Sequence, residues 1–262
     1  MNNLKKSIIK QIVFNFLNLN SWVIPAIYDL KKKYKRTFLG PMWNVLSNFI
    51  LILTISLVWT KILNLPFKDI LPHIFIGLIV WYFISDIFIG STTLLTEKYN
   101  NLFQNTFIPL LTICLRNLFT TFLVFIHNFP VVFFLLFLNF SLLNLFLLIF
   151  GIIILLFNLL NLSLIAIFLG TRFRDFKPFA SSIVSASTLL TPIMWKKEML
   201  GKYENFVYLN PFTHIIDIVR DPILGNNFNP IVYITSLSFL LIGFLIVHLL
   251  FKYKGTRIIF WI

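Results

Sequence analysis

The sequence predicts an all-α integral membrane protein: six transmembrane helices, an N-terminal amphipathic interfacial helix, and short re-entrant outer helices between spans 5 and 6. Composition points to this class first, because 58% of the 262 residues are apolar and 12% are charged, with a mean hydropathy of +0.89. A soluble domain is about half apolar and about a quarter charged. The other two observations are long runs without Asp, Glu, Lys or Arg and an uneven distribution of the cations. Together they exclude a soluble enzyme, a disordered chain and a disulfide scaffold.

The N-terminal segment, residues 1–39, is basic, and its part from Val23 to Phe38 is amphipathic. At helical spacing an apolar stripe is formed by Val23, Ile27, Leu30, Tyr34 and Phe38. The basic residues of the opposite side are Lys32, Lys33, Lys35 and Arg36. This pattern is typical of a helix that lies in the plane of the membrane interface. The alternative is a basic segment that only sets the topology.

The transmembrane domain, residues 40–251, divides into segments of the length that a bilayer requires, about 20 residues. The six segments are Pro41–Thr60, Leu71–Ser91, about Leu115–Leu138, about Asn144–Gly170, Pro178–Trp195 and Pro230–Phe251. The uncharged run from Asn117 to Thr171 holds 55 residues, so it fits two spans joined by a turn near Asn139–Asn144. Residues 252–262 are predicted to form a C-terminal tail.

The cations predict the orientation, because cytoplasmic segments carry an excess of Lys and Arg. With both termini inside, 16 of the 22 Lys and Arg residues are cytoplasmic and six are outside, where five acidic residues nearly balance them. The outer group includes Arg220, Asp217 and Asp221. The net charge of +13 is therefore interpreted as a membrane topology signal, and no nucleic-acid partner is expected.

Three connecting segments are more structured than free loops. The 2–3 connector, Leu94–Pro109, is polar and compatible with a helix, and the 4–5 connector, Thr171–Lys177, is short. Both are expected in the cytoplasm, where they either receive force from a partner or are plain solvated links. The outer segment from Trp195 to Asn229 is too apolar for a free loop. We expect it to form two short helices that dip into the outer leaflet.

The chain lacks the sequence signatures of common catalytic and nucleotide sites. Its only Gly-Lys pair, Gly201-Lys202, has no upstream glycine at the spacing of a phosphate-binding loop. The four histidines lie on separate segments, so neither a metal site nor a catalytic residue is expected. Asp86 is the one carboxylate inside a predicted span, and such a residue is a functional candidate. His127 and Asn128, beside Pro130, are expected to satisfy backbone groups that the proline frees.

Several segments together resemble the permeases of polysaccharide-export ABC transporters, the membrane subunits that export O-antigen, teichoic acid or capsule. The segments that carry the resemblance are Asp29-Leu30-Lys31, Tyr34 to Trp43, Phe173-Arg174-Asp175, Thr191 to Met194, Asn210-Pro211-Phe212, Arg220 and Gly225. Their order and spacing, and the six-span layout, fit nearly the whole chain. The chain departs from the family pattern at Asn48 and at Gln104-Asn105.

The resemblance implies a homodimer in the bacterial cytoplasmic membrane, with two separate ATPase subunits that bind ATP and Mg, so this chain itself needs no cofactor. The implied substrate is a glycan on a polyprenyl-pyrophosphate lipid. Its headgroup is expected at Lys32, Lys33, Lys35, Arg36 and Trp43, because basic side chains pair with phosphate. The expected ATPase contacts are Glu97, Tyr99, Leu102, Arg174 and Asp175.

Two further groups complete the implied sites. The expected outer gate consists of Asn210, Pro211 and Arg220. The aromatic side chains expected along the channel are Trp59, Trp81 and Tyr82, although an ordinary interfacial aromatic belt explains each of them equally well. Three alternatives remain beside the glycan exporter: an ABC permease for drugs or small lipids, an integral-membrane enzyme that acts on lipid-linked sugars, and a structural or assembly membrane protein with no transport role.

Overall fold

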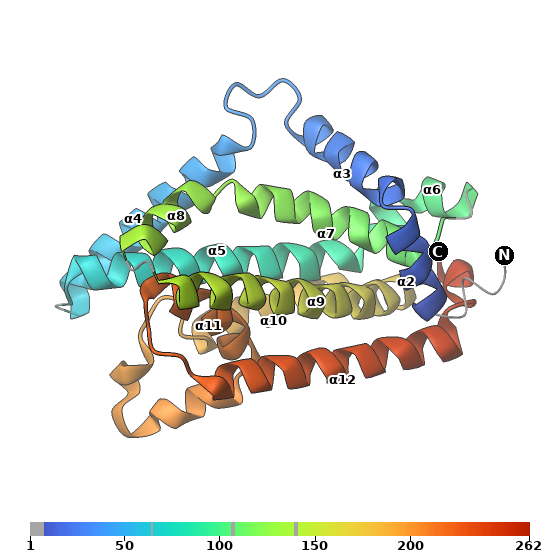
Figure 1. The fold of residues 1–262 in the computed structure, drawn as a ribbon. Coiled ribbons are helices and arrows are strands. Elements are labelled where there is room, and N and C mark those ends of the chain that lie inside the picture. Colours follow the sequence, from blue (N-terminus) through green and yellow to red (C-terminus); the bar gives the residue numbers. More distant parts are fainter. Residues whose placement is uncertain (1–7, 64, 106–107, 139–140) are drawn as a thin grey trace.

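The computed structural model describes residues 8–63, 65–105, 108–138 and 141–262 (Figure 1). Within these residues all regular elements are helices, which confirms the predicted all-α class. The long and medium helices are α2 (Ile8–Leu17), α3 (Asn20–Lys33), α4 (Met42–Leu63), α5 (Phe67–Thr92), α7 (Leu110–Ile126), α8 (Phe129–Leu138), α9 (Leu142–Arg172), α10 (Phe176–Leu190), α11 (Pro211–Leu224) and α12 (Pro230–Lys254). Shorter pieces are the π-helical turn η1 (Leu94–Lys98), α6 (Asn100–Asn105), η2 (Lys197–Leu209) and η3 (Ile258–Trp261).

Four helices of the described residues, α4, α5, α9 and α12, are long and apolar enough to cross a membrane, and α7 with α8 makes a fifth candidate. The segment predicted as span 5, Pro178–Trp195, is a helix only as far as Leu190. At about 1.5 Å per residue, the 15 residues of α10 extend roughly 22 Å, less than the bilayer core of about 30 Å. The chain is thus a multi-pass membrane protein with four or five full-length spans, and the sixth stays a prediction.

The third predicted span is broken, so the continuous helix expected over Leu115–Leu138 is wrong. Helix α7 begins earlier, at Leu110, and a bend of 55° separates it from α8. Pro130 lies in the first turn of α8 and cannot donate a backbone hydrogen bond. The side chains of His127 and Asn128 bond to the carbonyls of Leu123 and Phe125. The carbonyl that Pro130 frees is that of Ile126, so the role expected for these two side chains stays a prediction. The predicted turn at 139–144 lies partly outside the described residues.

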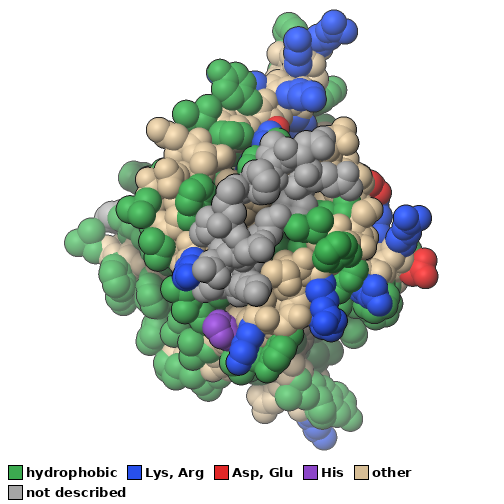
Figure 2. All heavy atoms as spheres, turned by 90° about the vertical axis from the view of Figure 1, so that its right-hand side faces the viewer, with side chains coloured by type: hydrophobic (Ala, Val, Ile, Leu, Met, Phe, Trp, Pro, Cys, Tyr) green, Lys and Arg blue, Asp and Glu red, His purple; other side chains and the backbone are tan. Residues whose placement is uncertain are grey.

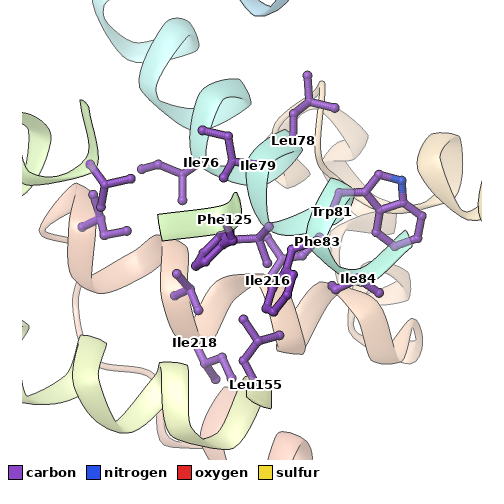
Figure 3. Close-up of a cluster of buried hydrophobic side chains, with 14 of the residues drawn as sticks. Ile76, Leu78, Ile79, Trp81, Phe83, Ile84, Phe125, Leu155, Ile216 and Ile218 are labelled. Carbon is purple, nitrogen blue, oxygen red and sulfur yellow. The ribbon is translucent and has the colours of Figure 1, made fainter. Parts of the chain in front are cut away.

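The core forms around α5, the most buried of the long helices. Figure 3 shows α5 side chains, including Ile79 and Phe83, meeting Phe125 of α7, Leu155 of α9 and Ile216 of α11. Glycines let the backbones approach closely, as is common between membrane helices. A Cβ on Gly151 would lie 2.2 Å from the Ile218 carbonyl oxygen, and one on Gly170 would lie 2.0 Å from the Thr92 carbonyl oxygen.

The outer segment does form two short helices, η2 and α11. Helix α11 lies inside the bundle, packed against α5, α8, α9 and α12. Gly201 divides η2 with a left-handed backbone (φ 52°), and Gly225 ends α11 with φ 73°. Most apolar residues of α11 are therefore buried inside the bundle, whereas Tyr203, Phe206 and Leu209 of η2 are exposed.

The described N-terminal helix α2 and the end of α12 lie at the same end of the bundle, which we call the terminal end (Figure 1). Helix α2 was not anticipated, and the amide N–H of Leu111 donates to its Gln11 side chain at 2.9 Å. Figure 2 shows Lys and Arg side chains around the terminal end, with few acidic ones. An end rich in cations agrees with the predicted orientation.

Candidate functional site

A partly buried ion pair at the terminal end joins three segments that are far apart in sequence. Arg116 of α7 donates from Nε and Nη2 to the two carboxylate oxygens of Asp29 in α3, each at 2.7 Å. Tyr99, between η1 and α6, donates its hydroxyl to the same carboxylate. The Arg116 guanidinium also lies 4.7 Å from the centroid of the Tyr99 ring. We call Asp29, Tyr99 and Arg116 the Asp29 junction.

The electrostatics of the Asp29 junction favour one protonation state. Burial alone would raise the pKa of the Asp29 carboxyl, but hydrogen bonds from Arg116 and Tyr99 outweigh it and hold that pKa below its ordinary value of 3.8. Burial, followed by the hydrogen bond to Asp29, raises the pKa of Tyr99. Burial lowers the pKa of the neighbouring Lys98, whose ammonium donates to Asn117 Oδ1 at 2.9 Å. The junction is thus an ionised carboxylate held by a guanidinium and a neutral phenol.

Helix α3 packs on α7 along the side that carries Asp29. Trp22 meets Phe119 edge to face at 5.6 Å, and the Thr120 hydroxyl donates to the carbonyl of the buried Ala26 at 3.3 Å. Ile24, Ile27 and Tyr28 are exposed on the other side. The apolar stripe expected from Val23 to Phe38 is therefore not the face that the protein buries, because tertiary contacts use Ala26 and Asp29 instead.

The two connectors expected to touch an ATPase meet each other at the terminal end. Lys177, at the start of α10, pairs with Glu97 of η1 at 3.3 Å, and both side chains are largely exposed. Arg174 and Asp175 are exposed as well, whereas Leu102 is half-buried. Tyr99 is 6% exposed, so it faces inward to Asp29 rather than outward to a partner. An open hollow of about 590 Å³ follows the connector from Thr96 to Leu102.

At the opposite end, Arg220 of α11 is the centre of a second buried cluster, which we call the Arg220 cluster. Its guanidinium pairs with Asp217, donates to the Pro192 carbonyl at 2.6 Å and lies 3.0 Å from His73 Nε2. The side chains of Arg220 and Asp217 are 5% and 6% exposed. The charge count placed both residues on the outer side, and in the structure they pair with each other inside the bundle.

Asn210 and Pro211, also expected at the outer gate, start α11. The Asn210 side chain accepts from the amide N–H of Phe212 at 3.0 Å, as an N-cap does. It also donates to the Thr191 hydroxyl at 2.8 Å. Pro211 is in the first turn of the helix, where its missing N–H has no cost. The three residues predicted to form the gate therefore lie at the start of α11 or within it. Asn210 and Arg220 attach this helix to the segment that follows α10.

Comparison with protein families decides the class of the molecule. The family model described as "ABC-2 type transporter" matches residues 25–224, a range that contains the Asp29 junction and the Arg220 cluster. The chain belongs to the ABC-2 type transporter family. This ABC-2 chain is also 24% identical over 241 residues to the "O-antigen export system permease protein RfbA" of Klebsiella pneumoniae, with 88% of this chain and 92% of the relative covered. The ABC-2 chain is accordingly a transport subunit and not an enzyme, and its family implies an ATPase partner.

The basic residues expected at the substrate headgroup of the ABC-2 chain are all exposed, but they do not share one helix face. Lys32 and Lys33 are in the last turn of α3. Lys35 and Arg36 follow the helix, and Arg36 has a left-handed backbone with φ 68°. The predicted continuous helix to Phe38 is therefore wrong. Trp43 is 55% exposed near the start of α4, just beyond this basic turn.

The expected channel aromatics of the ABC-2 chain have different environments. Trp81 is buried, donates to Thr188 of α10 at 2.8 Å and packs edge to face on Phe212. It therefore belongs to the core of this chain and does not line an open path. Trp59 and Tyr82 are half-buried.

Asp86 is exposed although it belongs to α5. The pKa of the Tyr34 phenol is raised by burial and, after it, by the negative charge of Asp86. This electrostatic effect places Asp86 within range of the segment that follows α3.

Sequence reasoning about the ABC-2 chain missed two residues of the Asp29 junction as site residues, Asp29 and Arg116. A signal was present, because Asp29 is the only acidic residue among the first 68 residues, while eight Lys or Arg occur among the first 36. A single carboxylate among so many cations indicates a position where a negative charge has a specific partner. His73 was also missed, and its apolar surroundings in the sequence gave no indication of the Arg220 cluster.

Proposed function

We propose that this permease exports a lipid-linked polysaccharide, such as O-antigen carried on polyprenyl pyrophosphate, across the cytoplasmic membrane of a bacterium. Separate ATPase subunits bind ATP and Mg and supply the energy. The observation that carries the proposal is the similarity to an O-antigen export permease over 88% of the chain. The shared region includes the basic turn, the connectors and α11.

The charge at the end of α3 supports a phosphate-bearing substrate. Lys32, Lys33, Lys35 and Arg36 are exposed within five positions of each other, and the exposed Ile24 and Ile27 of the same helix suit contact with acyl chains. Each basic residue near an anionic membrane surface contributes about 1 kcal/mol of attraction. A pyrophosphate headgroup lies at the depth of such residues, whereas a neutral drug would gain nothing from them.

The exposed surface of α4 supports a homodimer. Only 11% of the 18-residue apolar stretch of α4 is buried inside the chain, whereas 78% of the corresponding stretch of α5 is buried. A helix so little covered by its own chain has a full face available for a second copy. In the proposed assembly two copies of this permease enclose the path and each receives one ATPase subunit at the terminal end, which faces the cytoplasm.

Transport by the reconstituted complex tests this proposal. The permease is purified with its ATPase subunit, placed in proteoliposomes and supplied with a defined lipid-linked glycan. We expect ATP-dependent movement of the glycan, and no movement when the phosphate-loop lysine of the ATPase is replaced. Transport of a fluorescent small lipid or a drug without any movement of the glycan would contradict the proposal.

A further inference from the structure

We propose that the Asp29 junction is the linkage that transmits movement of the 2–3 connector to the basic end of α3. This inference rests on the proposed function and names three positioning residues for it. Tyr99 belongs to the connector, Asp29 to the helix that presents the basic turn, and Arg116 to the membrane-embedded α7. One carboxylate therefore joins the segment nearest to the ATPase with the segment nearest to the lipid headgroup.

The bonds of the junction are of the strong kind. The Arg116 guanidinium makes two parallel bonds to Asp29, a charge-assisted geometry that fixes orientation as well as distance. The Tyr99 ring lies against the same guanidinium, and the Tyr99 hydroxyl bonds to the same carboxylate. The side chains of Arg116 and Asp29 are 20% and 17% exposed, so water competes little for these groups. A displacement of Tyr99 must move Asp29 or break this arrangement.

The backbone of the connector is irregular where it approaches the junction. Tyr99 directly follows the π-helical turn η1, whose wider backbone ring is uncommon and recurs at functional positions in proteins. On its outer side the connector holds Lys177 through the exposed Glu97, a pair of the kind that contributes little to stability. The connector is therefore bonded to α3 through Tyr99 and to α7 through Lys98, whereas its pair with α10 is weak.

A purely static role for the junction makes a different prediction. If the three residues only hold α3 in place, any loss of export caused by substituting them should follow a loss of stability. Removal of the Tyr99 hydroxyl should then have the smallest effect of the three. The substitution Tyr99→Phe separates the two roles, because it keeps the ring on Arg116 and leaves the Asp29–Arg116 ion pair intact while it disconnects the connector from Asp29. Tyr28→Phe on the exposed side of α3 is the matched control, since Tyr28 is 66% exposed.

The test compares the parent, Tyr99→Phe, Asp29→Asn and Tyr28→Phe in proteoliposomes with the ATPase subunit. We expect Tyr99→Phe to stay folded and to keep its recovery of the ATPase and its rate of ATP hydrolysis. The amount of glycan exported per ATP should fall about fivefold or more, the range of typical coupling between sites, and Asp29→Asn should lower it at least as far. Tyr28→Phe should match the parent.

A second readout reports the linkage without reference to the cargo. Cys114, the single cysteine, is replaced by Ser, and a fluorescent probe is attached to a cysteine at the exposed Lys31 of α3. ATP should change the emission of the probe in the parent and leave it unchanged in Tyr99→Phe. If the probe responds in this way while the parent exports no glycan, the linkage stands and the proposed cargo is wrong. The linkage would be overturned if Tyr99→Phe exported as much glycan per ATP as the parent and its probe responded to ATP as the parent's does. It would also be overturned if the loss of export across the variants followed their loss of melting temperature.

Discussion

The contact between Gly170 and Thr92 gives a stability prediction with an internal control. A Cβ on Gly170 would lie 2.0 Å from the Thr92 carbonyl oxygen and 2.7 Å from its Cα, so Gly170→Ala requires α9 and α5 to separate by more than 1 Å. Overpacking of this kind costs about 1–3 kcal/mol, while alanine regains about 0.5–1 kcal/mol of helix propensity. The expected net loss is about 1–2 kcal/mol. Gly90→Ala on the same helix pair meets nothing within 4 Å and should be neutral or slightly stabilising.

The assay is thermal unfolding of the purified protein in detergent, followed by tryptophan fluorescence. For a chain of this size a loss of 1 kcal/mol lowers the melting temperature by roughly 2–4 °C, so Gly170→Ala should melt several degrees below Gly90→Ala. The pair separates local backbone contact from general helix propensity, because both substitutions add the same methyl group. If Gly170→Ala melts with or above Gly90→Ala, the close approach of α9 and α5 does not exist in the protein.

Three other predictions follow from the termini, the basic turn and the Asp29 junction. A cysteine at Lys197 should be labelled from outside intact cells and one at Lys33 should not, and the reverse pattern would contradict both termini being cytoplasmic. Changing Lys35 and Arg36 to Gln should weaken headgroup capture by up to roughly 30-fold, at about 1 kcal/mol per residue, while membrane level and ATPase recovery stay normal; export equal to the parent at all substrate concentrations would remove the capture role. The pKa of Asp29 is lower in the folded protein than its ordinary value of 3.8. The ionised carboxylate therefore stabilises the fold at any pH above 3.8, and this stabilisation is lost as the pH falls through the pKa of the folded state. The difference in melting temperature between the parent and Asp29→Asn should be constant from pH 8 to 5 and should shrink below pH 3.8.

Sequence patterning predicted the elements that depend on local composition. Runs without charge placed α4, α5, α9 and α12 within a few residues of their observed bounds, because the length of apolar helix needed to cross a bilayer is itself a strong constraint. Proline identified the start of α12 at Pro230. The same rule extended span 5 beyond the observed end of α10, because an uncharged run continues past Leu190 into Thr191–Met194, where the chain is no longer helical.

The sites were harder to predict, since each depends on residues that meet only after packing. Asp29, Tyr99 and Arg116 are separated by 70 and 17 positions, and no periodicity relates them. Tyr99 and Glu97 are two positions apart in one polar connector, yet one is buried and the other exposed. Arg220 was counted only as an outer cation, because a charge count does not include a partner. Its spacing of three from Asp217 was the available local signal for a pair on one helix.

The Arg220 cluster also bears on how the chain is made. Every group that contacts Arg220 in the cluster, His73, Pro192 and Asp217, precedes it in the sequence. During synthesis all the partners have therefore left the ribosome before the arginine does. Asp217 belongs to the same helix, so α11 enters the membrane as a neutral pair, which avoids most of the cost of inserting a lone charge. Helix α12 follows α11 in the chain and supplies none of these three partners, so the arginine can be paired before that helix is made.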